Sequence, residues 1–454
     1  MKKYLCMAAA GMLLFSACSN EDDVINNGNS SADFEGQELV MKVVSTGDGL
    51  TTRAARPLYS SEAGQKIDKV KLAIFKLDGD KIVSCVFQKT FDNWQTDGKD
   101  YGSTTDGFVD HGKYASVNLK KELDKGLESG DYMVYAVGYN TVNSVYNYTP
   151  TLESIVKDWN EATNFQSIKA ITQGNAEEIF AGSIAKITVD TDRNFTVEAG
   201  NPDNNILYLH RQVAGAFGYF MNIPAVGPDG TPATHLRLVA ADKNTTVNMT
   251  KFNTGFRTTG EEVKYVVNGE TPATTSDATF KDGTAGYEVY SIALNTWFTN
   301  GDSNNDGLYG KGDNWAIPQY IKEKGDFNAI SGSVFAGEFV VPFANKNVKT
   351  FELQLINANK GNQILRTWTI NLASAQKDVE KADGTKVENE STSSYSIVRN
   401  HLYTIGRKDI ANPTDPTEPT DPENPEDLSK GQILTLRVND NWEVINQLEV
   451  EPEI

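Results

Sequence analysis

The sequence has few of the residues on which catalytic and metal sites usually depend. Its 454 residues include three cysteines and four histidines. The histidines are scattered, and none has a spacing typical of a metal site or a catalytic triad. The chain contains no glycine-rich phosphate loop, Cys-x-x-Cys pair or nucleophile elbow. We therefore expect a protein that is not an enzyme and needs no cofactor.

Positive charge and long apolar runs are also scarce. The formal net charge is −19, so the surface repels polyanions. Nucleic acid and anionic membrane surfaces are therefore poor candidates as partners. Beyond the first residues, no apolar run is long enough to span a bilayer.

The first residues have the pattern of a secretory signal. Lys2 and Lys3 precede a short apolar segment, which is followed by small residues and a cysteine. The ending "FSAC" resembles the lipobox of bacterial lipoproteins, in which the chain is cut before the cysteine and the thiol is lipidated. We predict a signal peptide over residues 1–17 and a lipid on Cys18. The protein would then be an outer-membrane lipoprotein precursor held by its lipid, and a plain signal with a chance cysteine is the alternative.

The cysteine count agrees with this interpretation. Cys6 leaves with the signal and Cys18 carries the lipid, so Cys85 is left alone. No intrachain disulfide can form, and the fold must depend on its core.

Strand patterns dominate the rest of the chain. Segments such as "ELVMKVVS" and "SVFAGEFVVPF" are rich in β-branched and aromatic residues, and Gly, Asn and Asp turns separate them. "KVKLAIFKLDGDKIVSCVFQKTF" predicts a hairpin with an Asp-Gly turn, and only "TLESIVKDWNEA" predicts a helix. We predict an all-β protein with two antiparallel β-sandwich domains in series. The expected boundaries are residues 18–53 for a propeptide, 54–203 and 204–411 for the domains, 412–430 for a tether and 431–454 for a last strand segment.

The tether has proline at every third residue. Pro413, Pro416, Pro419, Pro422 and Pro425 predict a polyproline II helix, and a disordered linker is the alternative. Thirteen such residues would span about 40 Å.

Beyond the tether, two strand-like runs lack an evident partner in their own chain. An isolated strand exposes its backbone donors and acceptors, so we expect another copy of the chain to receive it. A head-to-tail contact of this kind does not close and makes a filament. The predicted donor residues are Ile433, Leu434, Leu436, Val438, Trp442, Val444, Leu448 and Val450.

A polar loop near the front of the chain offers a site for proteolysis. "LTTRAARPL" presents Arg53 and Arg56 to trypsin-like proteases, and the proline after Arg56 makes that bond a poor substrate. We predict a cut between Arg53 and Ala54, which would separate the strand "ELVMKVVS" from the first domain and leave a groove. An ordinary loop with two basic residues is the alternative.

One loop and the tryptophans have alternative interpretations. Asp302, Asn304, Asp306 and Asp313 in "GDSNNDGLYGKGDN" have a spacing that suits Ca²⁺, but an Asx-rich surface turn explains them as well. The six tryptophans could be platforms for sugars, or they could be core residues.

Several motifs in order resemble the fimbrillins of Bacteroidetes, the type V pilins of the major and minor fimbriae. They are "FSAC" at Cys18, "TTRA" at Arg53, "SGDYMVYAVGYN", "ILYLHRQVAGAF" and "IVRNHLYTI". The resemblance implies two transthyretin-like sandwich domains and a lipoprotein precursor cut after Arg53 by a trypsin-like protease. It also implies polymerisation by strand exchange, with residues 432–450 as the donor. The Pro-x-x repeat departs from this pattern.

The expected function is that of a fimbrial stalk subunit for surface adhesion. Its partners would be copies of itself, the anchor and tip subunits of the fimbria and the processing protease, and its final location the cell-surface fimbrium. The alternatives are an anchor or tip subunit, and a surface glycan-binding lipoprotein that keeps Cys18 and its lipid.

Overall fold

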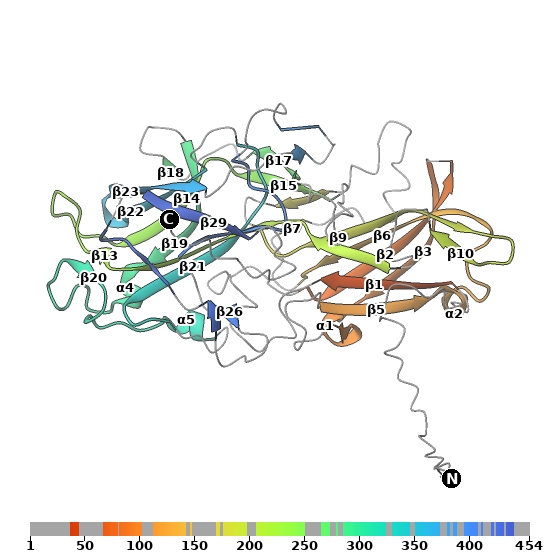
Figure 1. The fold of residues 1–454 in the computed structure, drawn as a ribbon, viewed down its shortest axis with the longest axis horizontal. Helices are drawn as coiled ribbons and strands as arrows, with labels where there is room; N and C mark the ends of the chain where they lie inside the picture. The colour runs from red at the N-terminus through yellow and green to blue at the C-terminus, as the bar shows by residue number, and fades with distance from the viewer. Residues whose placement is uncertain are drawn as a thin grey trace, which may run out of the picture. The chain divides into compact units, whose positions relative to one another are not determined.

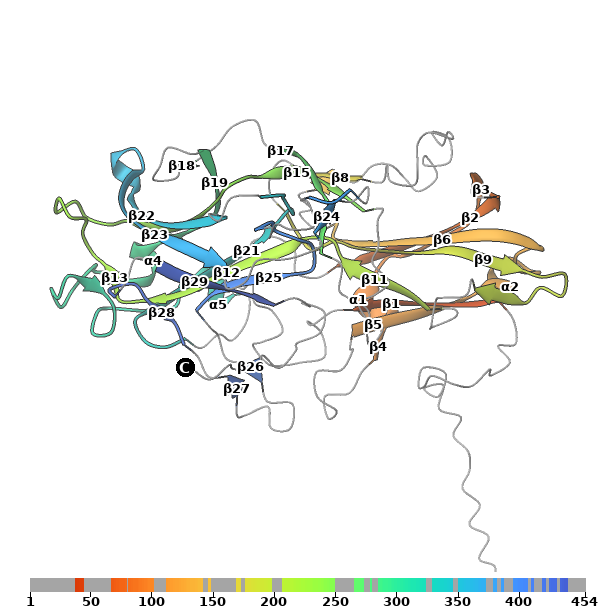
Figure 2. The ribbon, with the colours of Figure 1, turned by 45° about the horizontal axis from the view of Figure 1, so that its top comes forward.

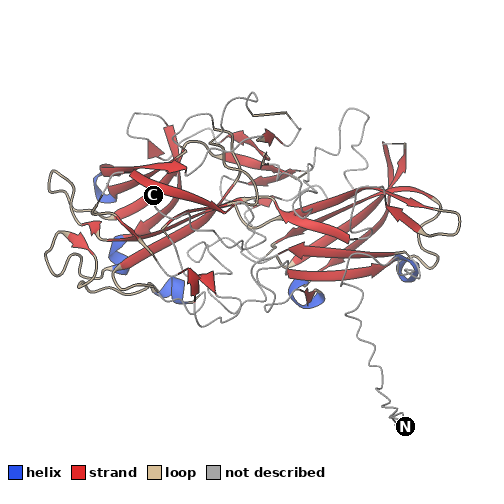
Figure 3. Cartoon of the chain, in the orientation of Figure 1, coloured by secondary structure: helices blue, strands red, loops and turns tan. Residues whose placement is uncertain are grey.

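The protein is described here from a computed structural model. The structure describes residues 37–44, 67–79, 81–101, 112–141, 146–147, 169–172, 176–197, 206–249, 265–272, 278–279, 285–323, 329–345, 350–372, 379–381, 385–387, 395–406, 410–411, 419–421, 424–430 and 433–439. These residues form mostly β-strands (Figure 3), which confirms the all-β prediction. The expected helix in "TLESIVKDWNEA" lies outside them. No helix among them is long and apolar enough to cross a membrane.

The helices within the described ranges are short. They are α1 (Trp94–Asp97), α2 (Leu119–Glu122), α4 (Leu294–Trp297), α5 (Gln319–Lys322) and the 3₁₀ helix η5 (Ala358–Lys360).

The first large sheet has nine strands among the residues described (Figure 1). In spatial order they are β3 (Lys81–Phe91), β2 (Lys69–Asp78), β6 (Gly130–Tyr139), β9 (Phe180–Val189), β11 (Ile206–Arg211), β1 (Glu38–Val44), β5 (Gly112–Asn118) and β4 (Lys99–Tyr101), with β10 (Phe195–Val197) beside β9. Strands β2 and β3 form the predicted hairpin, and Gly79 has a φ of +61° in its turn.

The second large sheet has ten strands within the described ranges. Their order is β18 (Ala278–Thr279), β19 (Ala285–Ala293), β14 (His235–Ala240), β22 (Phe351–Asn357), β23 (Gln363–Leu372), β29 (Ile433–Asn439), β25 (Leu402–Ile405), β12 (Ala214–Met221) and β21 (Ser333–Val340), with β28 (Glu426–Asp427) beside β12.

Smaller sheets accompany these two. One has the order β17 (Gly269–Pro272), β15 (Asn244–Asn248), β8 (Lys169–Thr172) and β7 (Tyr146–Asn147). Three pairs are β13 (Ile223–Pro224) with β20 (Leu308–Tyr309), β16 (Val266–Val267) with β24 (Glu380–Lys381), and β26 (Ile410–Ala411) with β27 (Pro419–Asp421).

Strand β11 corrects one expectation. We expected "ILYLHRQVAGAF" to open the second domain after residue 203, but Ile206–Arg211 pairs with β9 and β1 in the first sheet. The second large sheet takes up the chain at Ala214, the first residue of β12. The segment looks like one apolar strand in the sequence, but it is two strands in the structure. The chain changes sheet at the three polar residues His210, Arg211 and Gln212.

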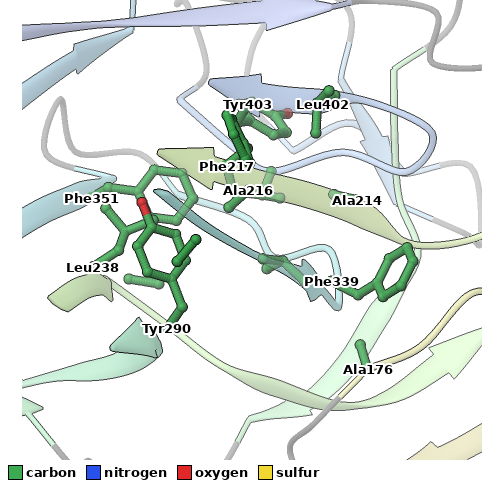
Figure 4. Packing of buried hydrophobic residues seen from close by; sticks show 14 of the residues in the cluster. Ala176, Ala214, Ala216, Phe217, Leu238, Tyr290, Phe339, Phe351, Leu402 and Tyr403 are labelled. Carbon is green, nitrogen blue, oxygen red and sulfur yellow. The ribbon is translucent and has the colours of Figure 1, made fainter. Parts of the chain in front are cut away.

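The two largest apolar clusters among the described residues form the cores of the sheets. In the first sheet, β6 and β9 lie over β1 and β5 as two layers (Figure 2), and a core cluster fills the space between them. A second and larger cluster, which we call the larger core, lies mainly among the strands of the second sheet. Strand β2 is buried on both sides, since Ile74 belongs to the first cluster and Phe75 to the larger core. In the larger core, Phe217, Phe351 and Tyr403 from three different strands face a common interior (Figure 4).

A buried polar junction brings together two of the sequence motifs. Arg211 of "ILYLHRQVAGAF" donates to Glu178 Oε1 at 2.6 Å, and both side chains are buried. It also donates to Asn400 Oδ1 of "IVRNHLYTI" at 3.4 Å, and Arg399 donates to Gln212 Oε1 at 3.0 Å. The two motifs, far apart in sequence, therefore fasten the start of β12 to the turn before β25.

We expect His401 of this junction to make stability depend on pH. Burial lowers its pKa to about 4, although its bond to the Arg399 carbonyl opposes the shift and the Arg399 charge adds to it. An unfolded histidine titrates near 6.5, so the unfolded chain binds more protons between pH 6.5 and 4, and stability falls as pH falls. Between pH 7 and 5 the free energy of unfolding should drop by about 2 kcal/mol from this group. Urea unfolding at both pH values, compared with His401→Gln, measures the effect. An equal drop in the variant would assign the effect to other groups.

We expect Leu434→Ala to destabilise the second sheet. Leu434 of β29 is 2% exposed and belongs to the larger core, so its truncation should lower the free energy of unfolding by about 2–5 kcal/mol. Val83→Ala is the control, because Val83 is 55% exposed. Denaturant unfolding of the monomer measures both, and an unchanged Leu434→Ala midpoint would mean that β29 does not occupy this sheet in solution.

Candidate functional site

The first strand lies inside the first sheet. Strand β1 pairs antiparallel with β5 along its whole length and parallel with β11 from Val40 to Val43 (Figure 2). Both of its edges are therefore occupied. Loss of β1 would open a slot one strand wide between β5 and β11, with unpaired backbone groups on both sides.

The floor of this slot is apolar. Leu39 and Met41 of β1 are completely buried and lie opposite Val117 and Ala115 of β5. Met41 also pairs with Leu207 of β11, and all five residues belong to one core cluster. Burial of a leucine or methionine side chain contributes about 1.5–3 kcal/mol. A strand that entered the slot would therefore need apolar residues at every second position.

Gln37, just before β1, is a buried polar contact that the sequence analysis missed. Its side chain is 0% exposed. Its Nε2 donates to the Leu127 carbonyl at 2.9 Å, and its Oε1 accepts the Leu127 backbone N–H. The same Nε2 lies 3.2 Å from the Arg193 carbonyl oxygen, and the Gln37 carbonyl accepts from the Leu119 N–H at 2.8 Å. We call the reciprocal bonds between Gln37 and Leu127 the amide clamp.

Gly126 makes room for the amide clamp. Its φ is +73°, a region that favours glycine, and a Cβ atom there would lie 2.6 Å from Gln37 Oε1. The backbone at residues 126–127 is therefore shaped around this one side chain.

The last strand has a place in its own chain. Residues Ile433–Leu436 of β29 pair parallel with β23, and Arg437–Asn439 pair antiparallel with β25. Our expectation that this strand lacks a partner in its own chain is wrong for the isolated chain. The reason is that β29 places Leu434 in the larger core and satisfies backbone groups of β23 and β25. Of the predicted donor residues, Ile433, Leu434, Leu436 and Val438 lie in β29, whereas Trp442, Val444, Leu448 and Val450 lie outside the described residues.

The two strands have similar local sequences, with four of nine aligned residues identical. Residues 36–44 read "GQELVMKVV" and residues 431–439 read "GQILTLRVN". Glycine, glutamine, leucine and valine recur at the same positions, and methionine and lysine are replaced by leucine and arginine. Each strand also has one parallel and one antiparallel neighbour. This repeat is the sequence signal that could have identified Gln37.

The described parts of the proline segment are paired. Pro419–Asp421 forms β27 beside β26, and Glu426–Asp427 forms β28 beside β12. Leu428 follows with a buried side chain in the larger core. Residues Glu426–Leu428 are thus attached to the second large sheet, and Pro419–Asp421 pairs with β26. Pro413, Pro416 and Pro422 lie outside the described residues, and a polyproline II helix there stays a prediction.

The predicted processing sites lie outside the described residues. This applies to the signal peptide at 1–17, to Cys18, and to Arg53 and Ala54. In the sequence, Arg53 and Ala54 fall between the end of β1 at Val44 and the start of β2 at Lys69.

The Asp/Asn loop uses its side chains to bind its own backbone. Asp302 accepts the N–H of Gly307 at 2.8 Å, Asn304 that of Asp306 at 2.9 Å, and Asp313 that of Ser303 at 2.8 Å. The bond from the Asp306 N–H to Asn304, and that from the Leu308 N–H to Asp306 at 2.9 Å, join residues two apart as in Asx turns, and the others close the loop over longer spans. Within the described ranges, no group of three or more His, Cys, Asp or Glu residues is arranged to hold a metal ion, and calcium binding here stays a prediction.

Three tryptophans are core residues. Trp94, Trp297 and Trp368 are buried, and Trp315 is half-buried with its Nε1 donating to the Ser333 carbonyl at 2.7 Å. Trp159 and Trp442 lie outside the described residues. The tryptophans that can be placed are not exposed platforms for sugar rings.

Comparisons with known proteins give similarity at the level of structure only. No family model and no curated protein matches the chain. Among solved structures, the tip fimbrial protein Mfa3 from Porphyromonas gingivalis with a C-terminal truncation is 10% identical, with coverage of 81% of this chain and 94% of that one, and a TM-score of 0.34. A fimbrial assembly protein from Parabacteroides distasonis is 11% identical (72% and 97% covered, TM-score 0.27), and the fimbrial anchor protein Mfa2 from Porphyromonas gingivalis 9% (73% and 81%, TM-score 0.30).

These are fimbrial proteins of Bacteroidetes, the group that the motifs resemble. At such low identities and TM-scores, a function for this chain has to be argued from its own residues.

We expect Gln37→Ala to loosen β1. The substitution leaves the Leu127 N–H and carbonyl without their buried partner, which should cost about 1–3 kcal/mol. Hydrogen exchange at the Leu127 amide should accelerate, and the free energy of unfolding should fall accordingly. Ser116→Ala on the neighbouring strand is the control, because Ser116 is exposed. Unchanged exchange at Leu127 would mean that the amide clamp does not hold β1.

Proposed function

We propose that this chain is a structural subunit of a cell-surface fimbrium, and that it polymerises by protease-triggered strand exchange to serve adhesion. The observation that carries the proposal is the position of β1. It is an inner strand of the first sheet, and it is followed by the connection that contains Arg53. One cut in that connection frees β1 from the residues that follow.

The proposed sequence of events begins with a lipoprotein precursor. Cys18 carries a lipid that holds the precursor at the outer membrane, and a trypsin-like protease cuts between Arg53 and Ala54. Residues 18–53 then leave with β1, and the slot between β5 and β11 opens. The C-terminal segment of a second copy, residues 432–450, enters the slot by strand addition.

Repetition of this contact makes a head-to-tail filament. Donor and slot lie on different parts of the chain, so each added copy presents a new slot and the assembly does not close. Anchor and tip subunits of the same fimbria would end the filament.

Strand exchange need not be costly, because β29 would leave one sheet to complete another. It gives up the pairing with β23 and β25, and it gains pairing with β5 and β11. Leu434 would move from one apolar core to the floor of another, where Leu39 is completely buried in the precursor. The backbone hydrogen bonds that β29 loses and gains are similar in kind. We therefore expect the free energy of moving β29 between the two sites to be small compared with its stabilisation at either site.

The experiment that tests the proposal is N-terminal sequencing of filaments sheared from cells. We expect the subunit to begin at Ala54. Arg53→Ala should abolish filament formation, and Arg56→Ala, which changes the poorly cleaved Arg-Pro bond, should leave it intact.

A lipidated Cys18 at the start of the filament subunit would contradict the proposal. So would filaments of normal yield from Arg53→Ala that retain residues 18–53. A lipidated protein with no filament fraction would favour an anchor subunit or a glycan-binding lipoprotein.

A further inference from the structure

The amide clamp and the repeated sequence point to one residue of the donor strand. When "GQILTLRVN" is aligned on "GQELVMKVV", Gln432 falls on Gln37 and Leu434 on Leu39. Val438 falls on Val43 in the same alignment. The glutamine precedes the buried leucine by two residues in both segments, and the period of two in an extended strand would put both on one face of the exchanged strand.

We propose that Gln432 is the positioning residue of the exchanged strand: it takes over the amide clamp on Leu127 of the receiving copy, and so sets the register of β29 between β5 and β11. This inference rests on the proposed strand exchange and adds the register and the residue that determines it. In this register Leu434 lies opposite Val117, as Leu39 does in the precursor, and Thr435 lies opposite Ser116.

The hydrogen-bonding groups of the receiving site match a glutamine side chain. Once β1 has left, the N–H and carbonyl of buried Leu127 lose the buried amide of Gln37, and the carbonyl of half-buried Arg193 loses a donor. Only a primary amide offers an acceptor and two donors on one planar group. Gly126 leaves the space that this amide fills. An apolar side chain at this position would leave the Leu127 backbone groups buried without partners.

The same contact excludes the neighbouring registers. A slip by one residue would turn Leu434 away from the core. A slip by two keeps the apolar face inward, but it would bring Leu434 rather than Gln432 against the Leu127 backbone groups. The alternation of apolar residues alone cannot reject this second slip, whereas the amide clamp can.

A peptide-binding experiment tests the inference on the processed chain. The receiver is the full-length protein cut after Arg53, and the probe is a fluorescent peptide of residues 431–439. We expect the Gln432→Ala peptide to bind about tenfold to a hundredfold more weakly, as befits one lost buried amide contact. The matched control is the Thr435→Ala peptide, since residue 435 lies on the opposite face, and its affinity should stay within about twofold.

Hydrogen exchange at Leu127 provides a readout that affinity alone does not. The unchanged peptide and the Thr435→Ala peptide should slow exchange of the Leu127 amide, and the Gln432→Ala peptide should not, even at saturation. A receiver with Ser116→Cys and Cys85→Ser should form a disulfide with a peptide carrying Thr435→Cys, and not with one carrying Arg437→Cys.

The outcomes separate the inference from the proposed function. If the 431–439 peptide binds and Gln432→Ala changes neither affinity nor Leu127 exchange, the inference is overturned and strand exchange stands. A control peptide of residues 36–44 has the sequence of β1 itself. If this peptide binds and the 431–439 peptide does not, strand exchange by β29 fails, and the inference fails with it. Absence of binding by both peptides would overturn both as well, because the slot would then not reopen.

Discussion

The pairing of backbone groups along both edges of an inner strand is the constraint on which this structure depends. Strand β1 satisfies β5 on one side and β11 on the other, and β29 does the same for β23 and β25. Neither strand can leave without exposing two edges at once. Loss of β1 would leave the edges of β5 and β11 unpaired, which favours the binding of a replacement strand. Strand β29, whose sequence resembles that of β1, is the candidate replacement.

Much of the fold could be predicted from the sequence, because alternation of apolar and polar residues reports directly on strands. The β2–β3 hairpin, β1 and β21 lie where the pattern placed them. The pattern could not say which strand pairs with which. It therefore did not place β11 in the first sheet or find the site of β29, since partners far apart in sequence leave no local periodic signal.

The candidate site was accessible to sequence reasoning only in part. The alternation of "ELVMKVVS" identified β1, but a polar residue such as Gln37 interrupts an apolar pattern and attracts no attention. Its role becomes visible only with the Leu127 backbone beside it. For the loop from Asp302 to Asp313, the sequence alone could not decide between an ion site and a surface turn, and the structure adds that its carboxylates accept backbone N–H groups. Calcium binding there stays a prediction.

The short segment before β29 bears on the mechanical character of the proposed filament. Leu428 is buried, and its N–H donates to the Met221 carbonyl at 3.0 Å, so the chain is held in place three residues before Gly431. If this fastening persists in the polymer, only the residues after Leu428 are free to reach the next copy, and each extends about 3.3 Å. The linker between neighbouring subunits would then be only a few residues long, and the proposed filament would be stiff rather than flexibly jointed.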